Sequence, residues 1–234
     1  LLHLIEERKL AWSSVNVALC AIKFFFRVTL KRKGVEFMVP RSRQPQRLPQ
    51  ILSAQEVMQI IEAAANPAHR ALLLTTYAAG LRLSEVSRLR VSDIDSARMT
   101  LRIEQGKGAK DRYALLSPRL LLELRAYWRS YRPREWLFFN SRDPGKPLDK
   151  HTVHRIYHRA KAGAGITKAG GIHALRHAFA THMLEGGVNV HSIQRLMGHG
   201  HMGTTARYFH LANKHLAGTP SPLELLDTAR AASQ

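Results

Sequence analysis

The sequence is poor in cysteine, since Cys20 is the single one in 234 residues. One thiol excludes a disulfide framework within the chain and fits a reducing compartment, so we expect a cytoplasmic protein. Cys20 stands in an apolar run, where we expect it to be a small buried hydrophobic residue. The chain also lacks an apolar run long enough to span a bilayer and a cleavable signal pattern. It begins with Leu1 and not with methionine, which indicates a fragment or a trimmed chain.

Acidic residues are scarce as well. Asp and Glu total 17 against 36 Lys and Arg, which gives a formal net charge of +19 and a sequence pI near 10.9. Such an excess makes a polyanion the expected partner, because neutralising phosphates releases condensed counterions. The charge argues against the metabolism of small acidic molecules. It leaves a structural RNA-binding protein open as an alternative.

The scarcity of carboxylates also argues against a metal-dependent nuclease or transposase. Asp93 and Asp95 form one close acidic pair, in a segment that is predicted to be a turn, and a two-metal site needs more ligands than this. The 13 histidines match no familiar metal-ligand spacing, and only one cysteine could join them. We therefore expect no metal and no other cofactor.

The residues that are present divide the chain into three parts. Residues 1–39 are predicted to form a partial helical N-terminal domain, with Ser13 and Ser14 as candidate N-caps. Residues 40–50 are rich in proline and basic residues without periodicity, which is typical of an extended linker. Residues 51–234 are predicted to form a second domain, and a hydrophobic content of 45% is enough for a real core.

The second domain is predicted to be mainly α-helical with a small antiparallel β-sheet. It opens with a capping box, Ser53-Ala-Gln-Glu56. Alternating apolar and polar residues on both sides of the basic turn at 106–110 predict a β-hairpin. Helix signals follow at Pro67 and at Ser117-Pro118, with Gly80 as a helix stop. Further predictions are a short buried segment at 136–139, a polar loop at 140–147, and helices at 149–162, 173–186, 189–197, 203–212 and 222–229.

Six residues form a candidate set for attack on a phosphodiester without a metal: Arg82, Lys107, His173, Arg176, His199 and Tyr208. Arginine and lysine stabilise negative charge on phosphate, histidine transfers protons, and an activated hydroxyl is a nucleophile. The i, i+3 spacing of His173 and Arg176 puts both on one face near a predicted helix N-terminus, which favours phosphate. Each residue alone has an ordinary explanation, such as a surface charge for Arg82, a helix cap for His199 or a core position for Tyr208.

Five spaced segments contain these residues. They are Ala79-Gly-Leu-Arg-Leu-Ser-Glu85, Gly106-Lys-Gly-Ala-Lys-Asp-Arg112, His173-Ala-Leu-Arg-His177, Leu196-Met-Gly-His199 and Thr204-Thr-Ala-Arg-Tyr208. Together they resemble the tyrosine recombinase, or phage integrase, family, and the resemblance covers residues 48–215. A chance match becomes improbable when several spaced motifs agree. The resemblance implies a recombinase catalytic-domain fold in residues 51–234 and the function of a site-specific DNA recombinase or integrase, as carried by mobile elements.

The resemblance also implies a role for each residue. In the family a tyrosine attacks the scissile phosphate and leaves a 3′-phosphotyrosyl bond and a free 5′-hydroxyl, so the nucleophile here is expected to be Tyr208. Arg82 and Arg176 are expected to bind the non-bridging phosphate oxygens. Glu85 matches an acidic position that supports the site in this family.

The remaining residues of the set are expected to handle protons and the phosphate. His199 is expected to add a donor to the phosphate, Lys107 to protonate the leaving 5′-oxygen, and His173 to assist proton transfer at the tyrosine or hold the phosphate. The implied reaction needs neither ATP nor a metal. The implied partners are double-stranded DNA and further copies of the chain. Four copies are expected to form a homotetramer on DNA, and the free chain is expected to be a monomer in solution. Residues 222–229 are expected either to dock on a neighbouring copy or to pack on their own domain.

One part of the resemblance is incomplete. Family members carry a helical N-terminal domain that closes a clamp around the duplex, and residues 1–39 are shorter than such a domain. The sequence therefore predicts either a truncated chain or a reduced clamp. Two other functions stay open, a type IB topoisomerase that only relaxes supercoils and a non-catalytic DNA-binding protein that has kept the fold.

Overall fold

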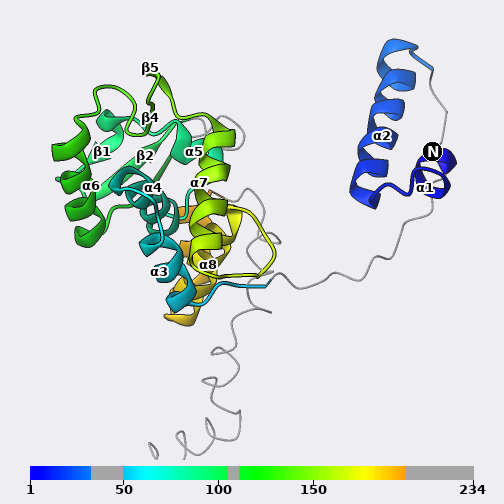
Figure 1. Cartoon of the computed structure of the whole chain (residues 1–234). Coiled ribbons are helices and arrows are strands. Elements are labelled where there is room, and N and C mark those ends of the chain that lie inside the picture. Colours follow the sequence, from blue (N-terminus) through cyan, green and yellow to red (C-terminus); the bar gives the residue numbers. More distant parts are fainter. Residues whose placement is uncertain (33–49, 105–110, 199–234) are drawn as a thin grey trace, which may run out of the picture. The chain divides into compact units, whose positions relative to one another are not determined.

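The computed structural model describes residues 1–32, 50–104 and 111–198, and the chain divides into two compact units, Leu1–Leu48 and Pro49–Gln234 (Figure 1). The three-part division at residues 1–39, 40–50 and 51–234 stays a prediction, because nearly all of the expected linker lies outside the described residues. The helices predicted at 203–212 and 222–229 lie outside them too.

The first unit is helical in its described part. Helix α1 spans Leu2–Glu6, and helix α2 spans Trp12–Phe24 and continues into a π-helical turn, η1, at Phe25–Thr29. Val15 and Leu19 lie one turn apart on α2 and are buried, so they mark its packed face.

Two local predictions for this unit are wrong. Helix α2 begins at Trp12 with Ala11 as its N-cap, so Ser13 and Ser14 lie in its first turn and do not cap it. Cys20 is exposed and not buried. It follows Leu19 in the sequence and is therefore rotated by about 100° from it, away from the packed face of the helix.

The second unit combines helices with two small antiparallel sheets. Its helices are α3 (Ala54–Glu62), α4 (Pro67–Ala78), α5 (Leu83–Ser87), the 3-10 turn η2 (Val91–Asp93), α6 (Pro118–Tyr131), α7 (Lys150–Gly163), α8 (His173–Glu185) and α9 (Val190–Met197). The first sheet has the order β1 (Ile94–Asp95), β2 (Thr100–Ile103), β3 (Arg112–Leu115), and the second pairs β4 (Phe139–Asn140) with β5 (Asp143–Pro147). The prediction of a mainly helical fold with a small antiparallel sheet is confirmed.

Several helices begin where the sequence predicted. Oγ of Ser53 accepts a hydrogen bond from the N–H of Glu56 at 3.1 Å, and the carboxylate of Glu56 accepts one from the N–H of Ser53 at 2.6 Å, so the capping box is formed. Pro67 is the first residue of α4, and Ser117 caps α6 by accepting from the N–H of Leu120. These local bonds satisfy N–H groups that a helix leaves unpaired at its start.

Gly80 ends α4 and allows α8 to approach. Its φ of +58° is unfavourable for residues with a side chain, and a Cβ at this position would lie 2.5 Å from Cδ1 of Phe179 on α8. A glycine is therefore required here for two independent reasons. The close approach brings the start of α5, which follows Gly80 in the chain, next to α8.

The segment at 140–147 differs from its prediction as a polar loop. It contains a short hairpin in which Phe139 pairs with Pro147 and Asn140 with Asp143. This pairing uses backbone groups, and without an apolar face there is no alternation in the sequence that could reveal it. The preceding segment is buried at Leu137 and Phe138, as predicted.

One hydrophobic core joins most elements of the second unit. Helix α4 packs against α6 and α8, helix α7 packs against α3 and α5, and α9 packs against α8 and β3 (Figure 1). As a result, the starts of α5, β3 and α8 and the end of α9 meet in one region. None of the helices in the described part of the chain combines the length and the apolar character of a membrane span.

Candidate active site

Arg82 lies between α4 and α5, and its side chain is fixed by two contacts. Its Nη1 donates to Oε1 of Glu85 at 2.6 Å, and its Nη2 donates to the carbonyl oxygen of Gly198 at 3.0 Å. The backbone N–H of Arg82 donates to Oε2 of Glu85 at 2.8 Å, so the carboxylate also holds the first turn of α5. These contacts fix the guanidinium group, and a ligand can still reach it because 19% of the Arg82 side chain is exposed.

Glu85 is the anion around which the site is arranged. Its side chain is only 5% exposed, and its Oε2 accepts a hydrogen bond from Nη2 of Arg112 at 2.7 Å and lies 3.7 Å from Nη1 of Arg176. Burial would raise the pKa of this carboxyl, but the charges of Arg112 and Arg176 and the hydrogen bonds from Arg82 outweigh burial and hold the pKa below its ordinary value. At neutral pH a buried carboxylate therefore holds three guanidinium groups together.

Arg176 is buried on α8 and links that helix to the C-terminal ends of two other helices. Its Nη1 donates to the carbonyl oxygen of Gly80 at 2.5 Å, and its Nη2 donates to the carbonyl oxygen of Met197 at 2.5 Å. The first bond reaches the end of α4, and the second reaches the end of α9. These contacts fix the plane of the guanidinium group, which is what the binding of a tetrahedral oxyanion in a defined orientation requires.

His173 is the first residue of α8, one turn before Arg176, and its side chain is accessible. Partial desolvation lowers the pKa of its imidazole below the ordinary value, and the positive charges of Arg176 and Arg82 lower it further, against the opposing charge of Glu85. The ring is therefore neutral at neutral pH. A neutral imidazole next to two guanidinium groups can accept a proton, as a general base does.

Arg112 is a member of this cluster that the sequence analysis did not select. It is the first residue of β3, where it pairs with Ile103 of β2, and its side chain is 9% exposed. Besides the bond to Glu85, its Nη1 donates to the carbonyl oxygen of Leu196 near the end of α9. The motif at 106–112 contains this arginine. A basic hairpin has no periodicity that would separate a buried arginine from solvated ones.

The structure thus brings Arg82, Glu85 and Arg176 into one cluster, with His173 in the same electrostatic environment. The other three predicted residues, Lys107, His199 and Tyr208, lie outside the described residues. The described chain ends at Gly198, the residue before His199 in the sequence. Within the described part, no group of three His, Cys, Asp or Glu side chains is arranged as metal ligands would be.

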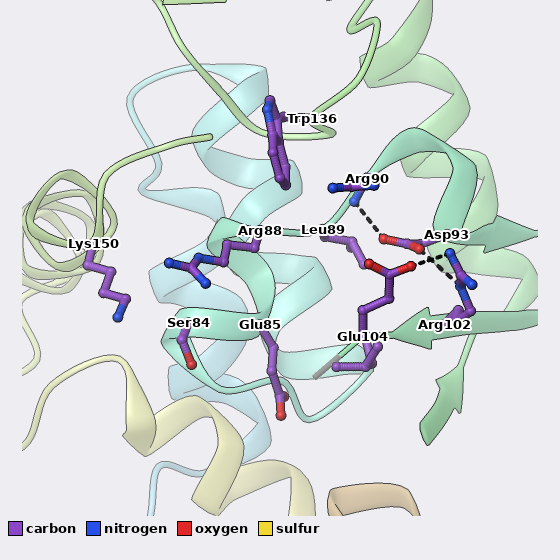
Figure 2. A pocket seen from close by; sticks show the side chains of 11 residues that line it. Ser84, Glu85, Arg88, Leu89, Arg90, Asp93, Arg102, Glu104, Trp136 and Lys150 are labelled. Atoms are coloured by element: carbon purple, nitrogen blue, oxygen red, sulfur yellow. Dashed lines mark hydrogen bonds and ion pairs between the residues drawn. The ribbon is translucent and has the colours of Figure 1, made fainter. Parts of the chain in front are cut away.

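A pocket of about 300 Å³ adjoins the cluster, and Glu85 contributes to its wall (Figure 2). Arg102 contacts two acidic residues there, with Nε 3.4 Å from Oδ1 of Asp93 and Nη2 2.5 Å from Oε1 of Glu104. Arg90 lies over the ring of Trp136, with its Cζ 5.0 Å from the ring centroid. The other lining residues are Ser84, Arg88, Leu89, Ile103 and Lys150.

The family model described as "Phage integrase family" matches residues 50–215, which include the guanidinium cluster and all six residues of the predicted set. The chain belongs to the phage integrase family. Its members are tyrosine recombinases, which cleave and rejoin DNA strands, and the prediction of a DNA recombinase is confirmed. DNA is its partner.

Relatives from bacteria and archaea match nearly the whole chain. The chain is 47% identical over 225 residues to a putative integrase/recombinase of Sinorhizobium fredii, a match that covers 96% of this chain and 73% of the relative. It is 34% identical over 234 residues to the tyrosine recombinase XerA of Pyrococcus horikoshii, with 96% and 79% covered.

Solved structures have the same fold. A crystal structure of XerA recombinase superposes with a TM-score of 0.64 at 25% identity and covers 100% of this chain and 80% of its own. The Tn1549 transposon integrase in complex with a circular intermediate DNA gives a TM-score of 0.70 at 16% identity, with 87% and 77% covered. The predicted fold of a recombinase catalytic domain is therefore confirmed.

Proposed function

We propose that this recombinase cleaves DNA with Tyr208 as the nucleophile and Arg82, Arg176, His173, His199 and Lys107 as the groups that assist it. The observation that carries the proposal is the buried carboxylate of Glu85, which holds the guanidinium groups of Arg82 and Arg176 within one cluster. Guanidinium groups held in advance need no reorganisation when charge develops on the phosphate, and this is the main source of electrostatic catalysis.

The proposed reaction exchanges one phosphoester for another. Oη of Tyr208 forms a bond to the scissile phosphorus as the bond from phosphorus to the 5′-oxygen breaks. The proton of the tyrosine passes to His173, and the 5′-oxygen takes a proton from Lys107 and leaves as a hydroxyl. The number of phosphoester bonds and the oxidation state of phosphorus stay the same, so neither ATP nor a redox cofactor is required. Attack by the 5′-hydroxyl of a partner strand reverses the step and rejoins the DNA.

The phosphate is proposed to lie against Arg82 and Arg176. A guanidinium group has five N–H donors, and the hydrogen bonds of the Arg82 side chain to Glu85 and Gly198 use two of them. Three N–H groups of Arg82 are therefore left for the non-bridging oxygens. Arg176 adds a second positive charge in the same cluster, and His199, next to Gly198 in the sequence, is proposed to add a further donor.

The proposed base, His173, gives the reaction a characteristic pH dependence. Since desolvation and the charges of Arg176 and Arg82 lower its pKa, the neutral form persists to a lower pH than for an ordinary histidine. We expect cleavage to stay fast below the ordinary histidine pKa of 6.5 and to decline only at lower pH. A decline centred at or above that value would exclude His173 as the base.

The working assembly is proposed to be a homotetramer on two DNA duplexes, with residues 222–229 docking on a neighbouring copy. Recombinase XerH, which shares the fold at a TM-score of 0.63 and 24% identity, has been crystallised on a palindromic difH substrate after cleavage. Palindromic DNA matches protomers related by a two-fold axis. Residues 1–39 are proposed to be part of a DNA clamp, and residues 40–50 are proposed to link it to the catalytic domain at 51–234. The enzyme is proposed to be located in the cytoplasm.

Replacement of Tyr208 by Phe tests the nucleophile. With a nicked suicide substrate, whose cleaved strand diffuses away, the wild type should accumulate a covalent protein–DNA adduct that maps to the peptide containing Tyr208. The Tyr208→Phe variant should form no adduct and bind the same DNA within about 0.5 kcal/mol of wild type, as expected when one hydroxyl is removed without refolding. An adduct that persists in the variant would refute the assignment.

Supercoiled DNA that carries two sites, used beside the suicide substrate, distinguishes the alternatives. A recombinase gives recombinant products from two sites, whereas a topoisomerase relaxes supercoiled DNA without them, and a non-catalytic binder gives no adduct at all.

A further inference from the structure

Arg112 connects three elements that meet at the site. From the first position of β3 its guanidinium group reaches Oε2 of Glu85 at 2.7 Å and the carbonyl oxygen of Leu196. The side chain is buried, and its Nε has no hydrogen-bond partner among the described residues. One side chain therefore links β3, α5 and the last turn of α9.

The two segments that Arg112 links each lead directly into a proposed catalytic residue. Lys107 lies between β2 and β3 in the sequence, five residues before Arg112, and α9 is followed in the sequence by Gly198 and His199. Gly198 has a φ of +60°, and a Cβ there would lie 2.5 Å from Cδ of Arg112. The aliphatic part of Arg112 thus packs closely on the residue before His199, while its charged end is held by Glu85.

We propose that Arg112 is a positioning residue that fixes the base of the Lys107 hairpin against Glu85 and the end of α9. The inference rests on the proposed role of Lys107 as the acid that protonates the leaving 5′-oxygen. Arg112 itself does not contact the phosphate in this proposal. It acts through Lys107, so its removal should slow the departure of the 5′-oxygen.

A sulfur substrate separates this role from a merely structural one. In DNA with a 5′-bridging phosphorothiolate at the scissile position, the leaving group is a thiolate, which departs without protonation because a thiol is far more acidic than an alcohol. On ordinary DNA we expect Arg112→Met to slow single-turnover cleavage by about 10²–10³-fold, the range of general acid catalysis. On phosphorothiolate DNA its rate should return to within about tenfold of wild type.

Three further variants make the result decisive. Arg112→Lys keeps the charge and provides a second test if the methionine variant folds poorly, and it should show a smaller decrease with the same recovery. Arg98→Met, at a side chain that is 81% exposed, should behave as wild type on both substrates. Lys107→Ala should be rescued by sulfur if the proposed function is right.

The outcomes distinguish failure of the inference from failure of the proposed function. Equal decreases for Arg112→Met and Arg112→Lys on both substrates, with Lys107→Ala rescued, would overturn the positioning role alone. No rescue of Lys107→Ala would instead overturn the acid role on which the inference depends.

A second inference comes from the pocket beside Glu85. Its acidic side chains are already engaged, since Asp93 and Glu104 both contact Arg102 and Glu85 contacts three arginines. The side chains of Arg88 and Lys150 are exposed and have no hydrogen-bond or ion-pair partner in the described part of the chain. Figure 2 shows both side chains extending toward the same space, Arg88 from the end of α5 and Lys150 from the first position of α7.

We infer that Arg88 and Lys150 bind a backbone phosphate of the DNA other than the scissile one. The pocket lining carries four cationic and three acidic side chains, and the cations without a partner favour an anion. The DNA that this family cleaves is the anion expected next to Glu85. Arg82 and Arg88 are separated along α5 by about 9 Å at 1.5 Å per residue. The bound phosphate is therefore expected within about three nucleotides of the scissile one.

The salt dependence of DNA binding tests this inference. In a Tyr208→Phe background, which keeps binding separate from cleavage, Arg88→Gln with Lys150→Gln should reduce the slope of log K against log salt by about 0.9 for each phosphate that the variant no longer neutralises. Arg98→Gln with Arg119→Gln, two arginines that do not line the pocket, is the matched charge control and should change the slope less.

Chemical neutralisation of one phosphate gives a second measurement. Single methylphosphonates are placed in turn at each of the about three nucleotides on either side of the scissile position. One of them should weaken wild-type binding and leave binding by the double variant unaffected. An unchanged slope would overturn the inference. A defect only in the assembly of several copies would overturn it as well and assign the pocket to a protein partner.

Discussion

Two clusters of arginines and carboxylates lie on neighbouring sides of α5, and burial makes them different. In the Glu85 cluster the side chains of Glu85, Arg112 and Arg176 are 5%, 9% and 5% exposed. In the neighbouring pocket Arg102 is 43% exposed and Glu104 is 39% exposed, although their ion pair is as short as those of Glu85. Water screens the ion pair of Arg102 with Glu104 far more than the ion pairs that Glu85 makes with Arg112 and Arg176, so similar distances have unequal energies.

The comparison explains why only one cluster is suited to catalysis. A buried carboxylate that compensates several guanidinium groups keeps them rigid and oriented. Exposed pairs exchange partners with water and hold no fixed geometry. The pocket can therefore contribute to DNA affinity, whereas the Glu85 cluster can stabilise a transition state.

Removal of the Glu85 charge should give the largest effect. Glu85→Gln keeps the shape of the side chain but leaves Arg82, Arg112 and Arg176 without their shared counter-charge. Breaking a buried ion pair costs about 3–5 kcal/mol, so the free energy of unfolding measured in urea should fall by that amount. A decrease below about 1 kcal/mol would show that the cluster is no more coupled than a surface pair.

Acid should weaken the Glu85 cluster selectively. The pKa of Glu85 is lowered in the folded protein from an ordinary value of 4.5, so below that pH the unfolded chain takes up this proton first. The stability that Glu85 contributes is therefore present above about pH 4.5 and is lost as the pH falls toward its folded pKa. Urea titrations from about pH 6 to about pH 3 should show a smaller decrease for Glu85→Gln than for wild type. Parallel curves would contradict the lowered pKa.

Alanine at Gly198 should have an intermediate effect, and the chain provides a matched control. Gly198 and Gly187 both have positive φ, +60° and +83°, so alanine at either position should cost about 1–2 kcal/mol of backbone strain. Only at Gly198 would the new Cβ meet Arg112, whereas at Gly187 it has nothing within 4 Å. Gly198→Ala should therefore reduce stability and adduct formation more than Gly187→Ala does. Equal effects of the two variants would mean that the packing of Arg112 on Gly198 does not matter.

Arg102→Gln should have the smallest effect. Asp93 keeps its hydrogen bond from the N–H of Arg90 at 2.8 Å when Arg102 is replaced, and Glu104 is exposed to water. We expect the melting temperature and the rate of adduct formation to match those of wild type. A clear decrease of either would show that the exposed cluster is coupled to the active site, and would remove the distinction drawn above.

Much of the fold could be predicted from local signals. The capping box at Ser53 and Glu56, the helix start at Pro67 and the helix end at Gly80 act over a few residues, so the sequence alone revealed them. The hairpin at 139–147 could not be predicted, because its strands pair through backbone groups. Cys20 was misplaced because its burial depends on which face of α2 is covered.

The sequence by itself determined the family and the residues available for its chemistry, because the motifs around Arg82, Glu85 and Arg176 have the residue types and the order that are typical of the family. Only the tertiary structure decided that Arg112 joins them, while the side chain of Arg88, six residues after Arg82, has no partner in the described part of the chain. The physical reason is that a charge acquires its energetic role from burial and from neighbours that are distant in the chain. Here those neighbours come from α5, β3, α8 and α9, and the core that packs these elements together sets the distances between them.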